Sequence, residues 1–121
     1  MRTDRELLER AAKAAAIETV YWNDGREPYS SGLGFILPSN RLWNPLDDDG
    51  DALRLAVKLH LMVDIRDDGA HTSVLGDYGL NTDELHGDNS GAATRRAIVR
   101  AAAEIGAQAH PDHKDGGAVY G

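Results

Sequence analysis

The spacing of apolar residues changes several times along this chain of 121 residues, and these changes limit the folds open to it. Over residues 3–17 and 47–59, apolar positions recur every three to four residues, as on one face of a helix. Over residues 61–66 they alternate, which is the period of a strand with one buried face. A chain that switches between these two periods predicts helices packed on a sheet.

The predicted elements follow the order αββαββα. Thr3 and Glu6 have the spacing of a capping box at the start of the first helix. Strands are predicted at 19–22, 34–37, 61–66 and 71–75, and each close pair is expected to form a hairpin. The polar stretch 76–91 is predicted to be a long loop. The last helix is expected to start at Asn89 or Ser90 and to end at Gly106.

This order predicts an α+β fold in which helices pack on one four-stranded, mainly antiparallel sheet. The length suits a single domain, which we place at residues 1–106, followed by a flexible tail at 107–121. A charged fraction of 27% and the absence of cysteine predict a soluble protein of the cytoplasm. The missing thiols exclude disulfides, cysteine nucleophiles and iron–sulfur clusters.

The negative charge is concentrated in the middle of the sequence. Residues 44–88 hold eleven acidic and three basic side chains, a net charge of −8 in a chain whose total is −7. Such a segment argues against nucleic-acid binding, because that binding depends on clustered Lys and Arg. Arg95, Arg96 and Arg100 form the one local basic cluster and are expected to face solvent.

Four aspartates follow the Trp43-Asn44-Pro45 stretch, at Asp47, Asp48, Asp49 and Asp51. Counted from Asp47, three of them match the first three ligand positions of a calcium-binding EF-hand loop. The glycine of that loop would have to stand at Ala52 instead of Gly50, and its final glutamate at Lys58, so the loop pattern fails. Carboxylates at this place suit the unpaired N–H groups and the positive end of a helix. We therefore interpret the cluster as an acidic helix start.

The histidines allow one further hypothesis, a metal site. His71 and His86 could combine with Asp64, Asp77 or Asp88 if the fold brought them together. His110 and His113, in the tail, lack a third ligand nearby. Because no spacing supports these sites, no catalytic residue, metal ligand or cofactor is predicted.

Two segments carry a resemblance to a known family. The stretch "WNPLDDDGDALRLAVKLHL" and the later "ATRRAIVRAAAEIG" resemble the phage ABA sandwich domain, a family of small phage and prophage proteins. With the strands between them, the similarity runs from about Glu6 to Gly106. It differs at Asp47, where similar sequences have Thr. The resemblance implies a helix–sheet–helix sandwich and an origin in a bacterial virus or prophage, without implying a reaction.

These observations favour a small phage or prophage accessory domain that is not an enzyme and acts by protein–protein contact in the bacterial cytoplasm. Two alternatives stay open: an acidic inhibitor that imitates nucleic acid before a host defence protein, and a metal-dependent hydrolase built from Asp and His. A purely architectural role through self-association is a third. The expected partner surface consists of acidic residues: Asp47, Asp48, Asp49, Asp51, Asp77, Asp83, Glu84 and Asp88.

Overall fold

The computed structural model describes residues 2–25 and 32–109 of the chain. In this part of the chain, three α-helices, six strands and one short 3₁₀ turn follow one another. Their bounds are α1 Asp4–Ala14, β1 Tyr21–Asp24, β2 Leu33–Ile36, β3 Leu42–Trp43, α2 Asp49–Lys58, β4 Met62–Arg66, β5 His71–Leu75, η1 Asp77–Gly79, β6 Asn81–Leu85 and α3 Ser90–Ala109. None of the described helices is both long and apolar enough to cross a membrane.

The α+β class is confirmed, but the single four-stranded sheet is wrong. The strands form two separate three-stranded antiparallel sheets, in the orders β1-β2-β3 and β4-β5-β6. Two strands, β3 and β6, were not predicted from the sequence. β3 has only two residues, too few to show a period, and β6 reads Asn-Thr-Asp-Glu-Leu, which lacks the apolar alternation of a half-buried strand.

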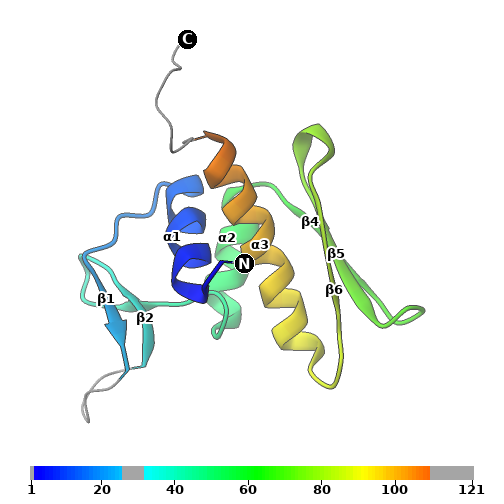
Figure 1. Ribbon diagram of the computed structural model, residues 1–121, viewed down its shortest axis with the longest axis horizontal. Helices are drawn as coiled ribbons and strands as arrows, with labels where there is room; N and C mark the ends of the chain where they lie inside the picture. The colour runs from blue at the N-terminus through cyan, green and yellow to red at the C-terminus, as the bar shows by residue number, and fades with distance from the viewer. Residues whose placement is uncertain (1, 26–31, 110–121) are drawn as a thin grey trace.

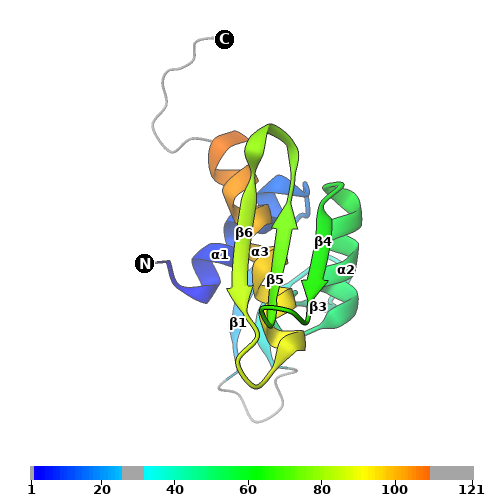
Figure 2. The ribbon, with the colours of Figure 1, turned by 90° about the vertical axis from the view of Figure 1, so that its right-hand side faces the viewer.

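Helix α3 occupies the centre of the molecule. It packs against α1 on one side and against β5 and β6 on the other, and α2 also contacts it. Figure 1 shows α3 between α1 and the β4-β5-β6 sheet, with the smaller β1-β2-β3 sheet at the opposite end. Turning the molecule by 90° shows the second sheet from its outer face, which no described helix covers (Figure 2).

The contact between α1 and α3 is close because small residues line it. Ala11 of α1 and Ala101 of α3 are completely buried. Gly106 faces α1 so closely that an added Cβ would lie 2.1 Å from the carbonyl oxygen of Arg10. The prediction that Gly106 ends the helix is therefore wrong: α3 continues to Ala109, and the missing side chain serves helix packing. The rest of the predicted tail, from 110 on, lies outside the described residues.

The stretch predicted as a long loop, 76–91, is mostly a second hairpin. The chain reverses over Asp77–Gly79, where Tyr78 and Gly79 have positive φ angles of 61° and 78°, as tight hairpin turns require. The returning strand β6 is held to the helix layer by Thr82, whose buried hydroxyl donates to the carbonyl oxygen of Ala97 over 2.8 Å. The two residues are fifteen positions apart in the sequence, so no local pattern predicts this contact.

Candidate binding surfaces

The first turn of α2 is held by the acidic residues that precede and begin it. Asp48 is the N-cap, and its Oδ2 accepts a hydrogen bond from the backbone N–H of Asp51 over 2.8 Å. This confirms the interpretation of the cluster as a helix start. Asp51 then reaches back to the strand side of the turn, where its Oδ2 accepts the backbone N–H of Asn44 over 3.0 Å.

Asp51 is a buried charge with two cationic partners. Its side chain is nearly inaccessible, and its Oδ1 lies 2.8 Å from Nη2 of Arg54 and 3.0 Å from Nη2 of Arg41. Both arginines are about half exposed or more, so they cover the carboxylate from outside. A carboxylate enclosed in this way joins α2 to the β3 end of the first sheet, and it is not available to a partner.

The residue before the proline completes this connection. Asn44 is buried, its amide Nδ2 donates to the carbonyl oxygen of Leu33 over 2.8 Å, and its Oδ1 accepts the N–H of Leu46 over 2.9 Å. The Trp-Asn-Pro-Leu-Asp-Asp-Asp-Gly-Asp segment therefore works as a structural turn between β2, β3 and α2. The sequence located this helix start correctly but gave no sign that the fourth aspartate is buried.

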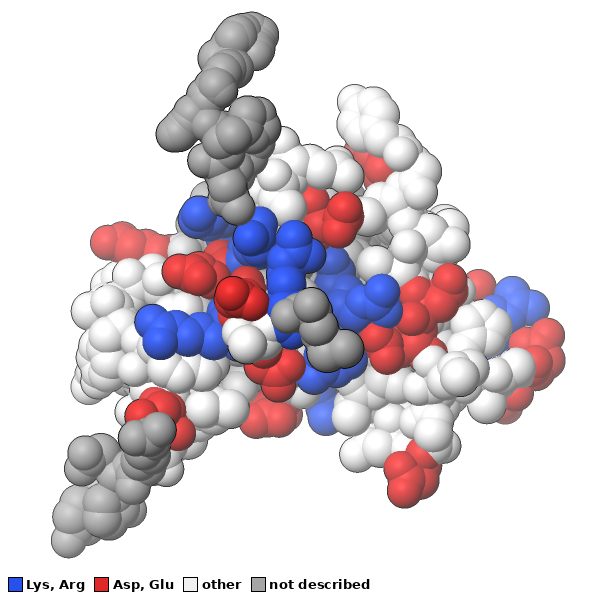
Figure 3. Space-filling view, viewed as in Figure 1, with Lys and Arg blue, Asp and Glu red and all other residues white. Residues whose placement is uncertain are grey.

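The three arginines of α3 were expected to face solvent, but they do not form a separate solvated face. Each ties α3 to a different element: Arg95 contacts Asp49 at 2.7 Å, Arg96 contacts Asp4 at 3.0 Å, and Arg100 contacts Glu84 at 2.6 Å. Figure 3, drawn from the same side as Figure 1, shows Lys and Arg side chains gathered across the middle of the molecule, with Asp and Glu side chains among and beside them. Two acidic residues of the segment 44–88, Asp49 and Glu84, are therefore paired with arginines of α3.

The eight residues of the expected partner surface lie on several parts of the fold. Asp47, Asp48, Asp49 and Asp51 are near the start of α2. Asp77 lies at the β5-β6 turn, and Asp83 and Glu84 are neighbours on β6 that point to opposite faces of the sheet. Asp88 lies between β6 and α3. This arrangement supplies no row of carboxylates along one face, which imitation of a nucleic acid would require.

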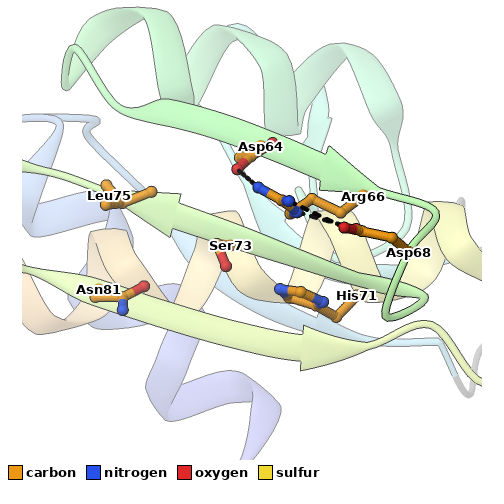
Figure 4. Close-up of a pocket in the computed structure, with 7 residues that line it drawn as sticks. All are labelled: Asp64, Arg66, Asp68, His71, Ser73, Leu75 and Asn81. Atoms are coloured by element: carbon orange, nitrogen blue, oxygen red, sulfur yellow. Dashed lines mark hydrogen bonds and ion pairs between the residues drawn. The ribbon is translucent and has the colours of Figure 1, made fainter.

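The outer face of the β4-β5-β6 sheet is polar at its centre. In the register of the three strands, Asp64, Ser73 and Asp83 form one cross-strand row, and Ser73 Oγ donates to Asp83 Oδ1. Asp64, Arg66, Asp68, His71, Ser73, Leu75 and Asn81 line a shallow hollow of about 340 Å³ on this face (Figure 4).

Arg66 dominates the electrostatics of this hollow. Its guanidinium lies between Asp68, at 3.1 Å, and Asp64, at 3.3 Å (Figure 4). Hydrogen bonding to Asp68, and then to Asp64, raises the pKa of Arg66 further above its ordinary value. The hydrogen bond from Arg66 in turn lowers the pKa of Asp68. Arg66 and Asp68 thus stay charged near neutral pH.

The two histidines of the metal hypothesis lie on opposite faces of this sheet. His71 lines the outer hollow, whereas Nε2 of His86 lies 2.9 Å from the hydroxyl of Thr72, a buried residue of the inner face. The same hydroxyl lies 2.8 Å from that of Thr94 on α3, so His86 takes part in packing the sheet on the helix. Across residues 2–25 and 32–109, no group of three His, Asp or Glu side chains could hold a metal ion. His110 and His113 lie outside these residues.

An apolar groove between α2 and β4 was not predicted from the sequence. It has a volume of about 310 Å³, and its apolar lining comes from α2, β4 and α3: Ala52, Leu53, Ala56, Val63, Ile65 and Ile98. Asp49, Thr94 and Arg95 complete the lining. The signal that could have revealed it is the width of the apolar stripe of α2, where Leu53 and Val57 extend beyond the residues needed to pack on α3.

Three large apolar side chains beside this groove are exposed to solvent. The exposed fractions are 63% for Leu53, 65% for Val57 and 61% for Ile65. Leu53 and Val57 are four residues apart on α2 and so share one face of the helix. Ile65 lies on the sheet face that α3 covers, in register with Thr72. A contiguous apolar surface of this kind is typical of a binding site.

Comparison of the chain with protein-family models, with curated proteins and with solved structures finds no match.

Proposed function

We propose that this chain is a non-enzymatic binding domain that acts by protein–protein contact, as a small accessory protein of a phage or prophage in the bacterial cytoplasm. The observation that supports this function best is the exposed apolar surface formed by Leu53, Val57 and Ile65 beside the groove. Burying each such side chain in an interface contributes on the order of 1.5–3 kcal/mol. The phage origin rests on the sequence resemblance alone.

The geometry gives less support to the alternatives. The polar hollow of the outer sheet face contains a serine bonded to an aspartate, but His71 makes no described hydrogen bond to that serine, so the residues do not form a nucleophile–base pair. The carboxylates considered for nucleic-acid imitation are spread over several elements and partly paired with arginine. Neither arrangement carries a second proposal.

Affinity capture from a bacterial lysate tests the proposed function when variants are compared. The full chain is immobilised as the wild type, as the double variant Leu53→Asp/Val57→Asp and as Leu85→Asp. Leu85 is a matched control because it is 78% exposed but lies on β6, away from the groove. We expect at least one protein that the wild type and Leu85→Asp retain and the double variant loses. Identical captured sets for all three chains would contradict the proposal.

A further inference from the structure

The free edge of β4 lies beside a helix surface that no described element covers. β4 has a strand neighbour on one side only, because it ends the order β4-β5-β6. Figure 2 shows α2 behind the sheet and beyond β4, on the side away from β5. Neighbouring strands stand about 4.8 Å apart. A further strand beside β4 would therefore pass over α2, with Leu53 and Val57 beneath it.

The helix layer behind this sheet, formed by α2 and α3, extends beyond the edge of the sheet at β4 (Figure 2). α3 covers β5 and β6, whereas α2 packs mainly against α3. This explains why Ile65 is largely exposed although it points to the helix side of the sheet. A fourth strand would cover Ile65 and the outer half of α2 together, and its main chain would satisfy the open N–H and C=O groups of β4.

The opposite edge of the sheet, at β6, does not offer the same support. Its helix-side residues are Thr82, which is buried and bonded to α3, and Glu84, which pairs with Arg100. An added strand there would cover an ion pair instead of an apolar surface. Strand addition uses main-chain hydrogen bonds for affinity and side-chain pockets for specificity. Of the two edges of this sheet, only β4 combines open main-chain groups with an apolar groove for side chains.

The charges at the ends of the groove define the occupant further. Only a short connection joins α2 to β4, so the helix and the strand run in opposite directions. The start of α2, with exposed Asp47, Asp48 and Asp49, therefore lies at the same end as Asp67, which follows β4. Arg95 pairs with Asp49 and Arg54 lies 3.9 Å from Asp48, so among the described residues Asp47 and Asp67 are the carboxylates at this end without a described ion pair. Lys58 marks the other end of α2. A segment bound here is favoured if it carries positive charge at the acidic end.

We propose that the β4 edge and the α2–β4 groove bind an extended segment of a partner protein by strand addition. The segment places apolar side chains at alternate positions into the groove and a Lys or Arg at the end that holds Asp47 and Asp67. This proposal rests on the proposed protein-binding function and specifies its site, its geometry and the class of partner. It also gives the acidic start of α2 a role in selecting the partner.

Synthetic peptides test this geometry directly against the full chain. The probe is fluorescein-labelled Lys-Thr-Val-Thr-Val-Thr, and its charge control has Glu in place of Lys. Fluorescence anisotropy is expected to show saturable binding with a Kd below about 1 mM. The Glu peptide should bind several times more weakly, and added salt should reduce this difference. Absence of saturation with the Lys peptide would overturn the proposal.

Variants and modified peptides separate strand addition from simple apolar contact. Ile65→Asp and Leu53→Asp are expected to weaken binding at least tenfold, whereas Leu85→Asp should leave it unchanged; circular dichroism checks that each variant is folded. Two further peptides are N-methylated either at the valines or at the threonines. Because alternate N–H groups of a strand point to the same edge, only one of these two should lose binding. Equal binding of both would overturn strand addition.

Two other occupants give different results. Occupation by a second copy would appear in sedimentation as concentration-dependent self-association that Ile65→Asp abolishes. Occupation by the chain's own residues 110–121 would appear as tighter peptide binding after their removal. Either result would overturn the assignment to a partner segment. If groove-dependent capture from lysate persists while no peptide binds, strand addition fails and the proposed function stands. If neither groove-dependent capture nor peptide binding is observed, both strand addition and the proposed function fail.

Discussion

Replacement of Gly106 by alanine gives the sharpest test of how α1 and α3 pack. An alanine Cβ at this position would lie 2.1 Å from the carbonyl oxygen and 2.9 Å from the carbonyl carbon of Arg10. Carbon–oxygen contacts normally exceed about 3.3 Å. The atoms in conflict belong to the backbone of α1, so no side chain can rotate away, and the two helices must separate by roughly 1 Å.

Two effects of opposite sign decide the result. Helix propensity alone favours alanine over glycine by about 1 kcal/mol. Overpacking of a closely packed interface costs about 1–3 kcal/mol and sometimes more, and a forced movement of two backbones lies at the upper end. We expect Gly106→Ala to lower the free energy of unfolding by about 1–3 kcal/mol, and to lower Tm by roughly 5–15 °C for a chain of this size.

Thermal and urea unfolding, followed by circular dichroism, measure this change. Gly91→Ala is the matched control, because Gly91 is exposed in the first turn of the same helix. An added Cβ there would meet Arg95 Nη1 at 3.4 Å and Asn89 Oδ1 at 3.5 Å, which are ordinary contacts. This variant should be neutral or slightly stabilising. If Gly106→Ala raised Tm as Gly91→Ala does, the described packing of α1 on α3 would be refuted.

Two further predictions concern carboxylates. Asp51→Asn should destabilise the fold by about 2–4 kcal/mol in urea unfolding, because it removes the charge that pairs with two arginines in a buried site; exposed Asp47→Asn is the control and should change stability by less than about 0.5 kcal/mol. NMR titration should give Asp68 a pKa below its ordinary value, and Arg66→Gln should restore it. Because the folded-state pKa of Asp68 is the lower one, the small contribution of this exposed pair to the free energy of unfolding is complete above about pH 4. It is lost as the pH falls through the folded-state pKa. An unchanged Asp68 titration in Arg66→Gln would count against the ion contact.

Features whose signals are short in range were predictable from the sequence. The capping box of α1 is present with both hydrogen bonds, from Glu6 N–H to Thr3 Oγ1 at 3.1 Å and from Thr3 N–H to Glu6 Oε1 at 2.9 Å. The hairpin of β4 and β5 follows from alternation and a turn at Asp67-Asp68-Gly69. Such features depend on residues within a few positions of one another, so local patterns are sufficient to indicate them.

The candidate site was only partly predictable. The sequence showed that the start of α2 is acidic, and it showed a wide apolar stripe on that helix. It did not show that Asp51 is enclosed by Arg41 and Arg54, or that Leu53, Val57 and Ile65 lie together. These relations depend on where α2 lies relative to β4, and no spacing along the chain encodes that position.

The sequence by itself therefore determined the α+β class, the helix starts and the pairing of β1 with β2 and of β4 with β5, because capping, periodicity and turns act over short stretches of chain. Tertiary structure decided the division into two sheets and the role of Gly106. It turned the polar segment at β6 into a strand, since Thr82 gains a buried hydrogen bond to α3 that offsets its weak apolar pattern. It also left one edge of β4 open over an apolar helix face. Burial and pairing between distant segments set these features, and they arise only when the elements come together.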